Sequence, residues 1–172
     1  MKFSFRDHLP DCAHLSPVII SGHESYELPY KEFILQHEGE QINGIYEIRY
    51  LTSGGPYKDV IEFGNFLVVG HYQFVYFYDL VNCFNTIRLE VDGYFGHIYI
   101  NDEVLYIADS GCLRCYNKNG KLVWCNTNLG IDGVFISDFT NEFIHGSGQW
   151  DPPDGWRDFK LDIKTGNLTN SG

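Results

Sequence analysis

Short hydrophobic runs alternate along the chain with turn-forming residues, and this pattern predicts strands rather than helices. In residues 92–130 the runs "YFGHIYI", "EVLYIA", "CLRCY" and "KLVWC" are separated by Asn101-Asp102, Asp109-Ser110-Gly111 and Asn119-Gly120. Asn-Gly between two hydrophobic runs is a strong signal for a hairpin. The segment is therefore typical of four short antiparallel strands joined by tight turns.

The same pattern occurs three times at a nearly constant spacing. Its leading apolar residues are Phe66, Val104 and Phe143, which are 38 and 39 residues apart. A second marker, Asp-Gly, precedes the later two units at positions 92–93 and 132–133. Repeats of this length indicate stacked units, each of which buries a face against the next.

We therefore predict a single all-β domain built as a repeat array of antiparallel sheets. Residues 59–91, 92–130 and 131–172 are blade-like repeats, and residues 1–58 form an N-terminal cap or a first irregular blade. About 40 residues per blade allow either a minimal four-bladed β-propeller or an open, partial propeller of about three blades. We favour the open array, in which the N-terminal segment covers an exposed edge. In that segment "GIYEIRYL" alternates as a strand does, whereas "PYKEFILQHEGE" is assigned a short helical turn.

The strand "YQFVYFYDL", residues 72–80, has aromatic or apolar residues on both of its faces. This pattern favours a central strand that is covered on both sides. A face on which a ligand stacks is the alternative interpretation.

The third repeat carries an insertion. The spans 66–79 and 104–117 each advance 13 residues, whereas the equivalent span 143–162 advances 19. The extra residues lie in "QWDPPDGW", residues 149–156, whose two prolines exclude the centre of a strand. We interpret this segment as an ordered turn or a projecting loop.

The insertion is also the strongest candidate for a partner-binding site. Trp is enriched at interface hot spots, and prolines lower the entropic cost of holding a loop. The candidate residues are Trp150, Asp151, Asp154 and Trp156, together with Asp109 in a turn and Tyr72 at the start of the aromatic strand. In the alternative interpretation, the tryptophans cover the open end of the stack and the aspartates cap turns or pair with Arg157.

Two parts of the chain resemble the quinoprotein-type (PQQ-like) propeller repeat. In "VLYIADSGCLRCYNKNGKLVW" the residues Gly120, Leu122 and Trp124 match positions of that repeat, and "FKLDIKTGNL" is similar to its second half. The resemblance implies a propeller-like fold. It brings no cofactor, because quinone-binding propellers are far longer and their binding residues have no counterpart here.

A second resemblance concerns the run W-D-P-P-x-G-W-R-x-F near the C-terminus. The run is similar to one in small acidic bacterial proteins with blade-like repeats, the immunity proteins of polymorphic or contact-dependent toxin systems. It comprises Trp150, Asp151, Pro152, Pro153, Gly155, Trp156, Arg157 and Phe159. This resemblance implies inhibition of a toxin and carries no catalytic residue.

The formal net charge of -11 at pH 7 argues against nucleic-acid binding, since phosphate backbones repel an acidic surface. The same charge favours fast encounter with a basic partner. No apolar run has the length of a membrane span, and Arg6, Asp7 and His8 interrupt the first hydrophobic residues, so we expect a cytoplasmic protein. The five cysteines are then reduced thiols. Cys112 and Cys115 form a CxxC without a second ligand pair and are expected to be core or half-buried.

Recognised catalytic motifs are absent from the sequence. There is no GxSxG, phosphate-binding loop or dinucleotide glycine motif, and "GSG" at residues 146–148 is interpreted as a turn. His71, His97 and His145 are weak candidates for a zinc site, because they lie near turns or strands of the repeats.

The sequence thus predicts a non-catalytic protein-binding module without a cofactor. Most concretely, it predicts an immunity protein that occludes the active site of a basic toxin such as a nuclease. One alternative is a small metal-binding protein or enzyme that uses the histidines. The other is a structural repeat protein that assembles with itself.

Overall fold

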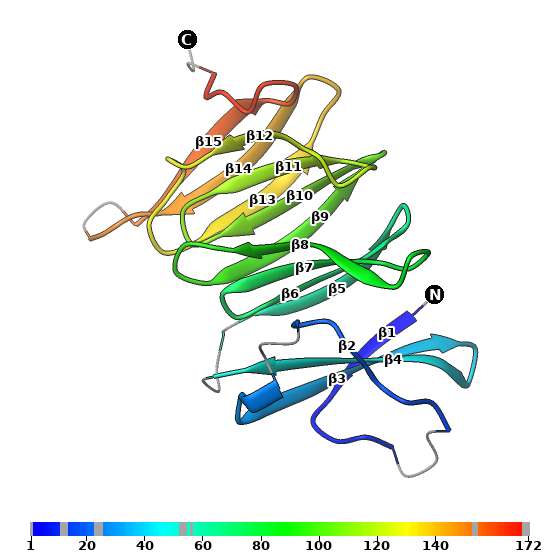
Figure 1. The fold of residues 1–172 in the computed structure, drawn as a ribbon. Helices are drawn as coiled ribbons and strands as arrows, with labels where there is room; N and C mark the ends of the chain where they lie inside the picture. Colours follow the sequence, from blue (N-terminus) through cyan, green and yellow to red (C-terminus); the bar gives the residue numbers. More distant parts are fainter. Residues whose placement is uncertain are drawn as a thin grey trace.

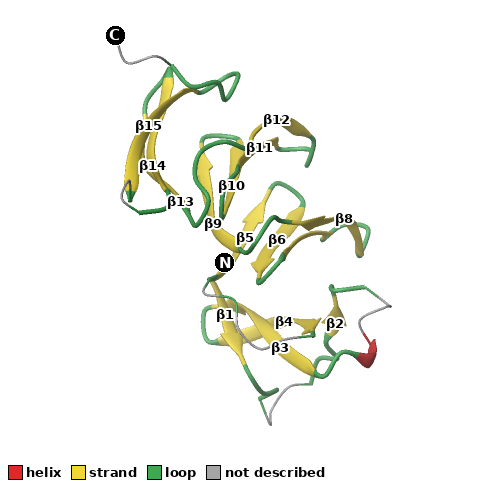
Figure 2. Cartoon of the chain, turned by 90° about the vertical axis from the view of Figure 1, so that its left-hand side faces the viewer, coloured by secondary structure: helices red, strands yellow, loops and turns green. Residues whose placement is uncertain are grey.

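The computed structural model describes residues 2–10, 14–22, 26–51, 55, 57–152 and 155–169. These residues form an all-β fold of four sheets, which we name A to D in chain order (Figure 1). In Figure 2 the sheets follow one another in a curved stack, with sheet A at one end and sheet D at the other. No described strand of sheet D pairs with sheet A, so the stack is open.

Sheet A is built from the N-terminal segment and differs in topology from the other sheets. Its strands are β1 (Lys2–Arg6), β2 (Val18–Ile19), β3 (Tyr30–Glu38) and β4 (Gln41–Tyr50), in the order β1-β3-β4-β2. Strand β2 runs parallel to β4, whereas the other pairs are antiparallel. The helical turn predicted for residues 29–40 is wrong. Phe33 and Leu35 are buried in one cluster and Ile34 in another, as alternation along a strand requires.

Sheets B, C and D are antiparallel arrays of consecutive strands. Sheet B comprises β5 (Lys58–Phe63), β6 (Phe66–His71), β7 (Phe74–Asp79) and β8 (Phe84–Glu90). Sheet C comprises β9 (Phe95–Asn101), β10 (Val104–Asp109), β11 (Leu113–Asn117) and β12 (Leu122–Asn126). Sheet D comprises β13 (Val134–Phe139), β14 (Phe143–Gln149) and β15 (Trp156–Asp162), and Leu168 adds an isolated bridge to Leu161.

The repeat register predicted from the sequence is confirmed. Each leading apolar residue begins the second strand of its sheet and pairs with the last residue of the third strand. The equivalent pairs are Phe66–Asp79, Val104–Asn117 and Phe143–Asp162. The array has four sheets and is open.

Apolar side chains fill the space between each pair of neighbouring sheets. Strand β7 shows the arrangement most clearly, since Val75 and Phe77 pack in the cluster shared with sheet C. Tyr76 and Tyr78 pack in the cluster shared with sheet A. The prediction of a central strand covered on both sides is therefore confirmed. A third cluster joins sheet C to sheet D and includes Trp124.

The "GSG" string at residues 146–148 is not the predicted turn but part of strand β14. A Cβ atom on Gly148 would overlap the backbone carbonyl of Leu129. The connection between sheets C and D therefore lies directly against this strand. The backbone N–H of Ile131 donates to the carbonyl of Gln149 over 2.8 Å and fixes the connection there.

A side-chain-capped turn follows the third strand of each repeat. The Oδ1 atom of Asp79 accepts hydrogen bonds from the backbone N–H groups of Val81 and Asn82, both at 2.8 Å. Asp162 and Asn117 occupy the equivalent position. Their Oδ1 atoms likewise accept hydrogen bonds from backbone N–H groups of the turn that follows. These bonds to the ionised form lower the pKa of both aspartates. The largest contribution at Asp79 comes from the Asn82 side chain and at Asp162 from the Thr165 side chain.

We predict that these two turns make the fold sensitive to acid. A carboxyl group with a lowered pKa in the folded state stabilises the fold above its unfolded pKa. That contribution is lost as the pH falls below about 4 and through the folded value. The variant Asp162→Asn keeps an acceptor, as Asn117 does, and should lose less stability between pH 7 and pH 3 in urea unfolding. The reverse variant Asn117→Asp should lose more stability over the same pH range. An equal loss of unfolding free energy in both variants and the unchanged protein would contradict the prediction.

Candidate partner-binding site

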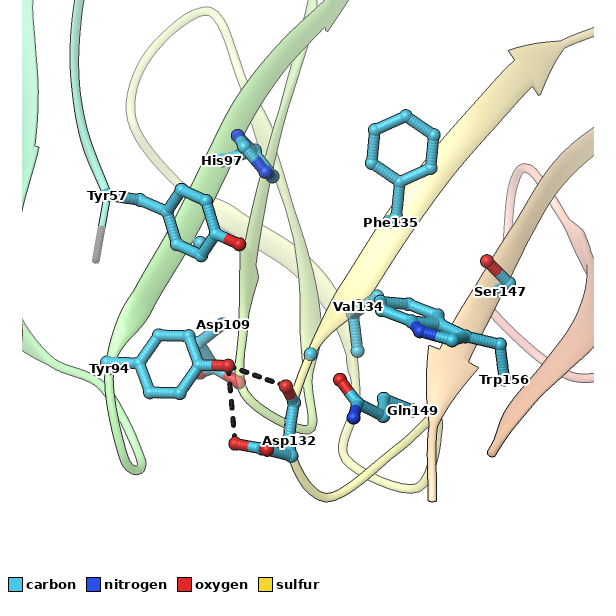
Figure 3. Close-up of a pocket in the computed structure, with 12 residues that line it drawn as sticks. Tyr57, Tyr94, His97, Asp109, Asp132, Val134, Phe135, Ser147, Gln149 and Trp156 are labelled. Atoms are coloured by element: carbon cyan, nitrogen blue, oxygen red, sulfur yellow. Dashed lines mark hydrogen bonds between the residues drawn. The ribbon is translucent and has the colours of Figure 1, made fainter. Parts of the chain in front are cut away.

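A cavity of about 390 Å³ lies where the first strands of sheets B, C and D come together (Figure 3). Tyr57, just before β5, contributes from sheet B. Tyr94 contributes from just before β9, Gly96 and His97 from its start, and Asp109 from the end of β10. The remaining lining residues belong to sheet D or lead into it: Asp132, Gly133, Val134, Phe135, Ser147, Gln149 and Trp156.

Strand alternation places the sheet D side chains at this cavity. Val134 and Ile136 of β13 belong to the core between sheets C and D, so Phe135 points to the other side of the strand. Phe135 pairs with Ser147, and Gln149 pairs with Trp156 in the last rung of the β14–β15 ladder. These side chains thus reach the cavity because of their register.

Aromatic rings form two walls of the cavity. In Figure 3, Tyr57, Tyr94 and His97 lie on one side, and Phe135 and Trp156 lie on the other. The Tyr57 ring centroid is 6.2 Å from that of Tyr94 and 4.7 Å from that of His97. The His97 ring is edge-on to Phe135, with 6.1 Å between centroids. The walls therefore contact one another and are held in place by the sheets.

Asp132 supplies an exposed carboxylate to the cavity. The Tyr94 hydroxyl donates to the Asp132 backbone carbonyl over 2.5 Å and lies 3.4 Å from its Oδ1 atom. Burial first, and then the charge of Asp132, raise the pKa of Tyr94. Tyr94 therefore remains a protonated hydrogen-bond donor at neutral pH and holds the backbone of Asp132 in place.

Asp109 belongs to the turn between β10 and β11, and its exposed fraction is 0%. Its Oδ1 atom accepts hydrogen bonds from the backbone N–H groups of Gly111 (3.0 Å) and Cys112 (2.7 Å). Its Oδ2 atom is paired with Arg114. Both carboxylate oxygens are engaged in these contacts, so Asp109 serves to hold the turn and its arginine partner.

The insertion in the third repeat lengthens both the ladder and the loop of the β14–β15 hairpin, which projects from the side of the stack in Figure 1. The sequence suggested that Gln149 and Trp156 belong to a loop. In the structure they pair with each other and extend the ladder instead. The backbone N–H of Trp150 donates to the carbonyl of Gly155 over 2.7 Å and closes the turn. Pro153 and Asp154 lie outside the described residues.

The two tryptophans of the insertion have different surroundings. Trp150 is half-buried, and the Arg157 guanidinium lies 5.4 Å from its ring centroid. Trp156 is 54% exposed and lines the cavity. Asp151 is exposed beside them. The insertion thus packs the Trp150 ring against its own chain and leaves the Trp156 ring exposed to solvent at the cavity.

Tyr72 lies at a different place in the fold. It forms part of the two-residue turn between β6 and β7, with a φ angle of 55°. It lines a second cavity of about 290 Å³ between sheets A and B. The structure does not bring Tyr72 together with Trp156.

The three candidate zinc ligands lie on strands of three different sheets. His71 is buried in β6, with its Nε2 atom 3.1 Å from Oε2 of Glu32. Burial acts to raise the pKa of Glu32, but bonds with His71 and Lys58 outweigh it and lower the pKa. His97 lines the cavity on β9, and His145 lies on β14. Within the described ranges, no three His, Cys, Asp or Glu side chains are grouped to hold a metal ion.

The CxxC cysteines are buried free thiols, as predicted. Cys115 lies in β11 and Cys112 just before it. Burial raises the pKa of Cys112 to about 12 and that of Cys115 to about 11. Both are therefore protonated at neutral pH, which makes them poor nucleophiles and poor metal ligands.

Sequence reasoning missed Tyr57, Tyr94, Asp132 and Phe135 as parts of one site. One signal was available, because Asp132 belongs to the repeated Asp-Gly marker. The marker located the start of a repeat but not a cavity. Tyr57 and Trp156 are brought to one cavity only by the stacking of three sheets.

A comparison with protein families finds none that matches this chain, and a comparison with curated proteins finds no match either. Within the part of the chain that the structure describes, we find no helix with the length and hydrophobicity needed to cross a membrane.

Proposed function

We propose that the protein is a non-catalytic protein-binding module, an immunity protein that occludes the active site of a basic toxin such as a nuclease. The observation that carries the proposal is the half-exposed Trp156 beside Phe135 and Asp132 at the cavity. No Lys or Arg occurs among the described residues that line it. Exposed aromatic anchors next to a carboxylate are suited to a basic protein surface.

The overall charge supports the same partner class. A nuclease site is basic because it holds phosphates, and an inhibitor that presents carboxylates takes the place of those phosphates. With a net charge of -11, the protein would be drawn to such a site over distances of about a Debye length. The resemblance of residues 150–159 to immunity proteins points to the same role in the cytoplasm of a bacterium.

The propeller-like interpretation of the fold is part of the proposal. Sheets B, C and D follow the blade pattern of consecutive antiparallel strands in matching register. Sheet A is the first, irregular blade, since its strand order differs. In this interpretation, the site lies where the inner strands of the blades converge.

The function predicts a tight and salt-sensitive complex with a basic protein encoded beside this one. We expect coexpression to protect cells from that protein, and the dissociation constant to rise with salt concentration. The variant Trp156→Ala should raise the dissociation constant at least about 30-fold, as loss of a hot-spot residue does. Isothermal titration at two salt concentrations measures both effects.

The matched control is Phe84→Ala, which removes an aromatic ring that is 52% exposed on β8, away from the cavity. This variant should bind like the unchanged protein. If the neighbouring gene product neither binds nor is inhibited, the proposed function is wrong. Light scattering of the isolated chain tests self-assembly, the alternative outcome.

A further inference from the structure

The cavity between sheets B, C and D has aromatic walls that are open to solvent. Tyr57, Phe135 and Trp156 are 44%, 46% and 54% exposed. A free protein rarely leaves three large rings half-exposed around one hollow unless something binds there. Aromatic faces attract cations, and a planar guanidinium also stacks on them.

One end of the same cavity carries acceptors of hydrogen bonds. Asp132 offers a carboxylate that forms no ion pair with any Lys or Arg among the described residues. The Tyr94 hydroxyl donates to the backbone carbonyl of the same residue and lies 3.4 Å from its carboxylate, so this contact supplies no counter-charge. Gln149 lies close to Asp132 in Figure 3 and adds an amide oxygen. A carboxylate without a counter-charge matches the paired N–H groups of a guanidinium.

We propose that this cavity binds a single arginine side chain presented by the protein partner. The guanidinium would lie between the aromatic walls and donate to Asp132, while Trp156 covers its stem. This inference rests on the proposed function and names the chemical group that is recognised. Asp132 and Trp156 are then the residues that select arginine over other side chains.

Size and charge favour arginine over other occupants. At about 390 Å³ the cavity is near the lower end of the range for small-molecule sites, which suits one long side chain. The carboxylate repels phosphates and other anions. A lysine ammonium satisfies the charge, but it is compact and strongly hydrated and gains less from stacking.

The test uses the isolated full-length chain and a minimal probe, N-acetyl-arginine amide. Titration followed by NMR should shift the Trp156 indole resonance and the backbone amide resonance of Ser147, which also lines the cavity, with a dissociation constant on the order of 1 mM. N-acetyl-citrulline amide has nearly the same shape without the charge and should bind at least about tenfold more weakly. The lysine analogue should bind more weakly than the arginine probe.

The variants Asp132→Asn and Trp156→Ala should each weaken binding of the arginine probe about five- to tenfold. The control Asp138→Asn makes the same charge change at an exposed position on β13 outside the cavity and should leave binding unchanged. Equal binding of arginine and citrulline, or unaltered binding by Asp132→Asn, would overturn the inference. Such a result leaves the proposed function standing if the partner complex still forms. Conversely, if the arginine probe binds but no complex with a protein partner forms, only the proposed function is contradicted.

Discussion

Replacing Asp109 with Ala should lower the free energy of unfolding by about 3–5 kcal/mol. The carboxylate is fully buried, and the side chain of its partner Arg114 is only 11% exposed. Removing the carboxylate leaves a nearly buried guanidinium without its counter-charge. It also leaves two turn N–H groups, those of Gly111 and Cys112, without an acceptor. Urea unfolding at pH 7, with a slope close to that of the unchanged protein, measures the loss.

The matched variant is Asp109→Asn, which keeps an oxygen acceptor for the turn and removes only the charge. We expect an intermediate loss of about 1–3 kcal/mol. A loss below about 1 kcal/mol for Asp109→Ala would show that the buried pair does not hold this turn. If folded Asp109→Asn binds the partner normally, the role of Asp109 is confined to stability, as its burial indicates.

The second large effect is expected for Gly148→Ala, at about 3 kcal/mol or more. The new methyl group would overlap the carbonyl oxygen of Leu129, which is backbone and cannot rotate away. Relief requires the connection between sheets C and D to move off β14. That movement breaks the hydrogen bond from Ile131 to Gln149. Thermal and urea unfolding should both show the loss.

Two neighbouring substitutions separate this overlap from other causes. Ser147→Ala changes the adjacent residue of the same strand and should alter stability by no more than about 0.5 kcal/mol. Gly155→Ala meets no atom within 4 Å, but its φ angle of 58° should cost about 1–2 kcal/mol of backbone strain. If Gly148→Ala is no more harmful than Ser147→Ala, the connection does not pack closely against β14.

The sequence by itself determined the strand content, the repeat and its register. Phe66, Val104 and Phe143 were aligned from spacing alone, and they begin equivalent strands. The two-sided pattern of residues 72–80 correctly indicated a central strand. These features follow from periodicity and turn chemistry, which act between residues a few positions apart.

Local patterns failed where a distant part of the chain decides the structure. Most of residues 29–40 form strand β3 (Tyr30–Glu38), in which Ile34 packs in the cluster shared with sheet B. The two glycines of "GSG" belong to a strand in which other parts of the chain fill the space of the missing side chains. The Phe159 ring and the Phe135 carbonyl do so at Gly146, and the connection from sheet C does so at Gly148. The same string in isolation is a good turn signal.

Only the tertiary structure decided the candidate site. Trp156 was selected from composition, but Tyr57 and Asp132 became its neighbours through the stacking of sheets B, C and D. Asp109 was a partner-binding candidate in the sequence and is a buried structural anion in the fold. Burial and proximity depend on how the sheets pack face to face. That packing is set by contacts between residues far apart in the chain, which no short segment contains.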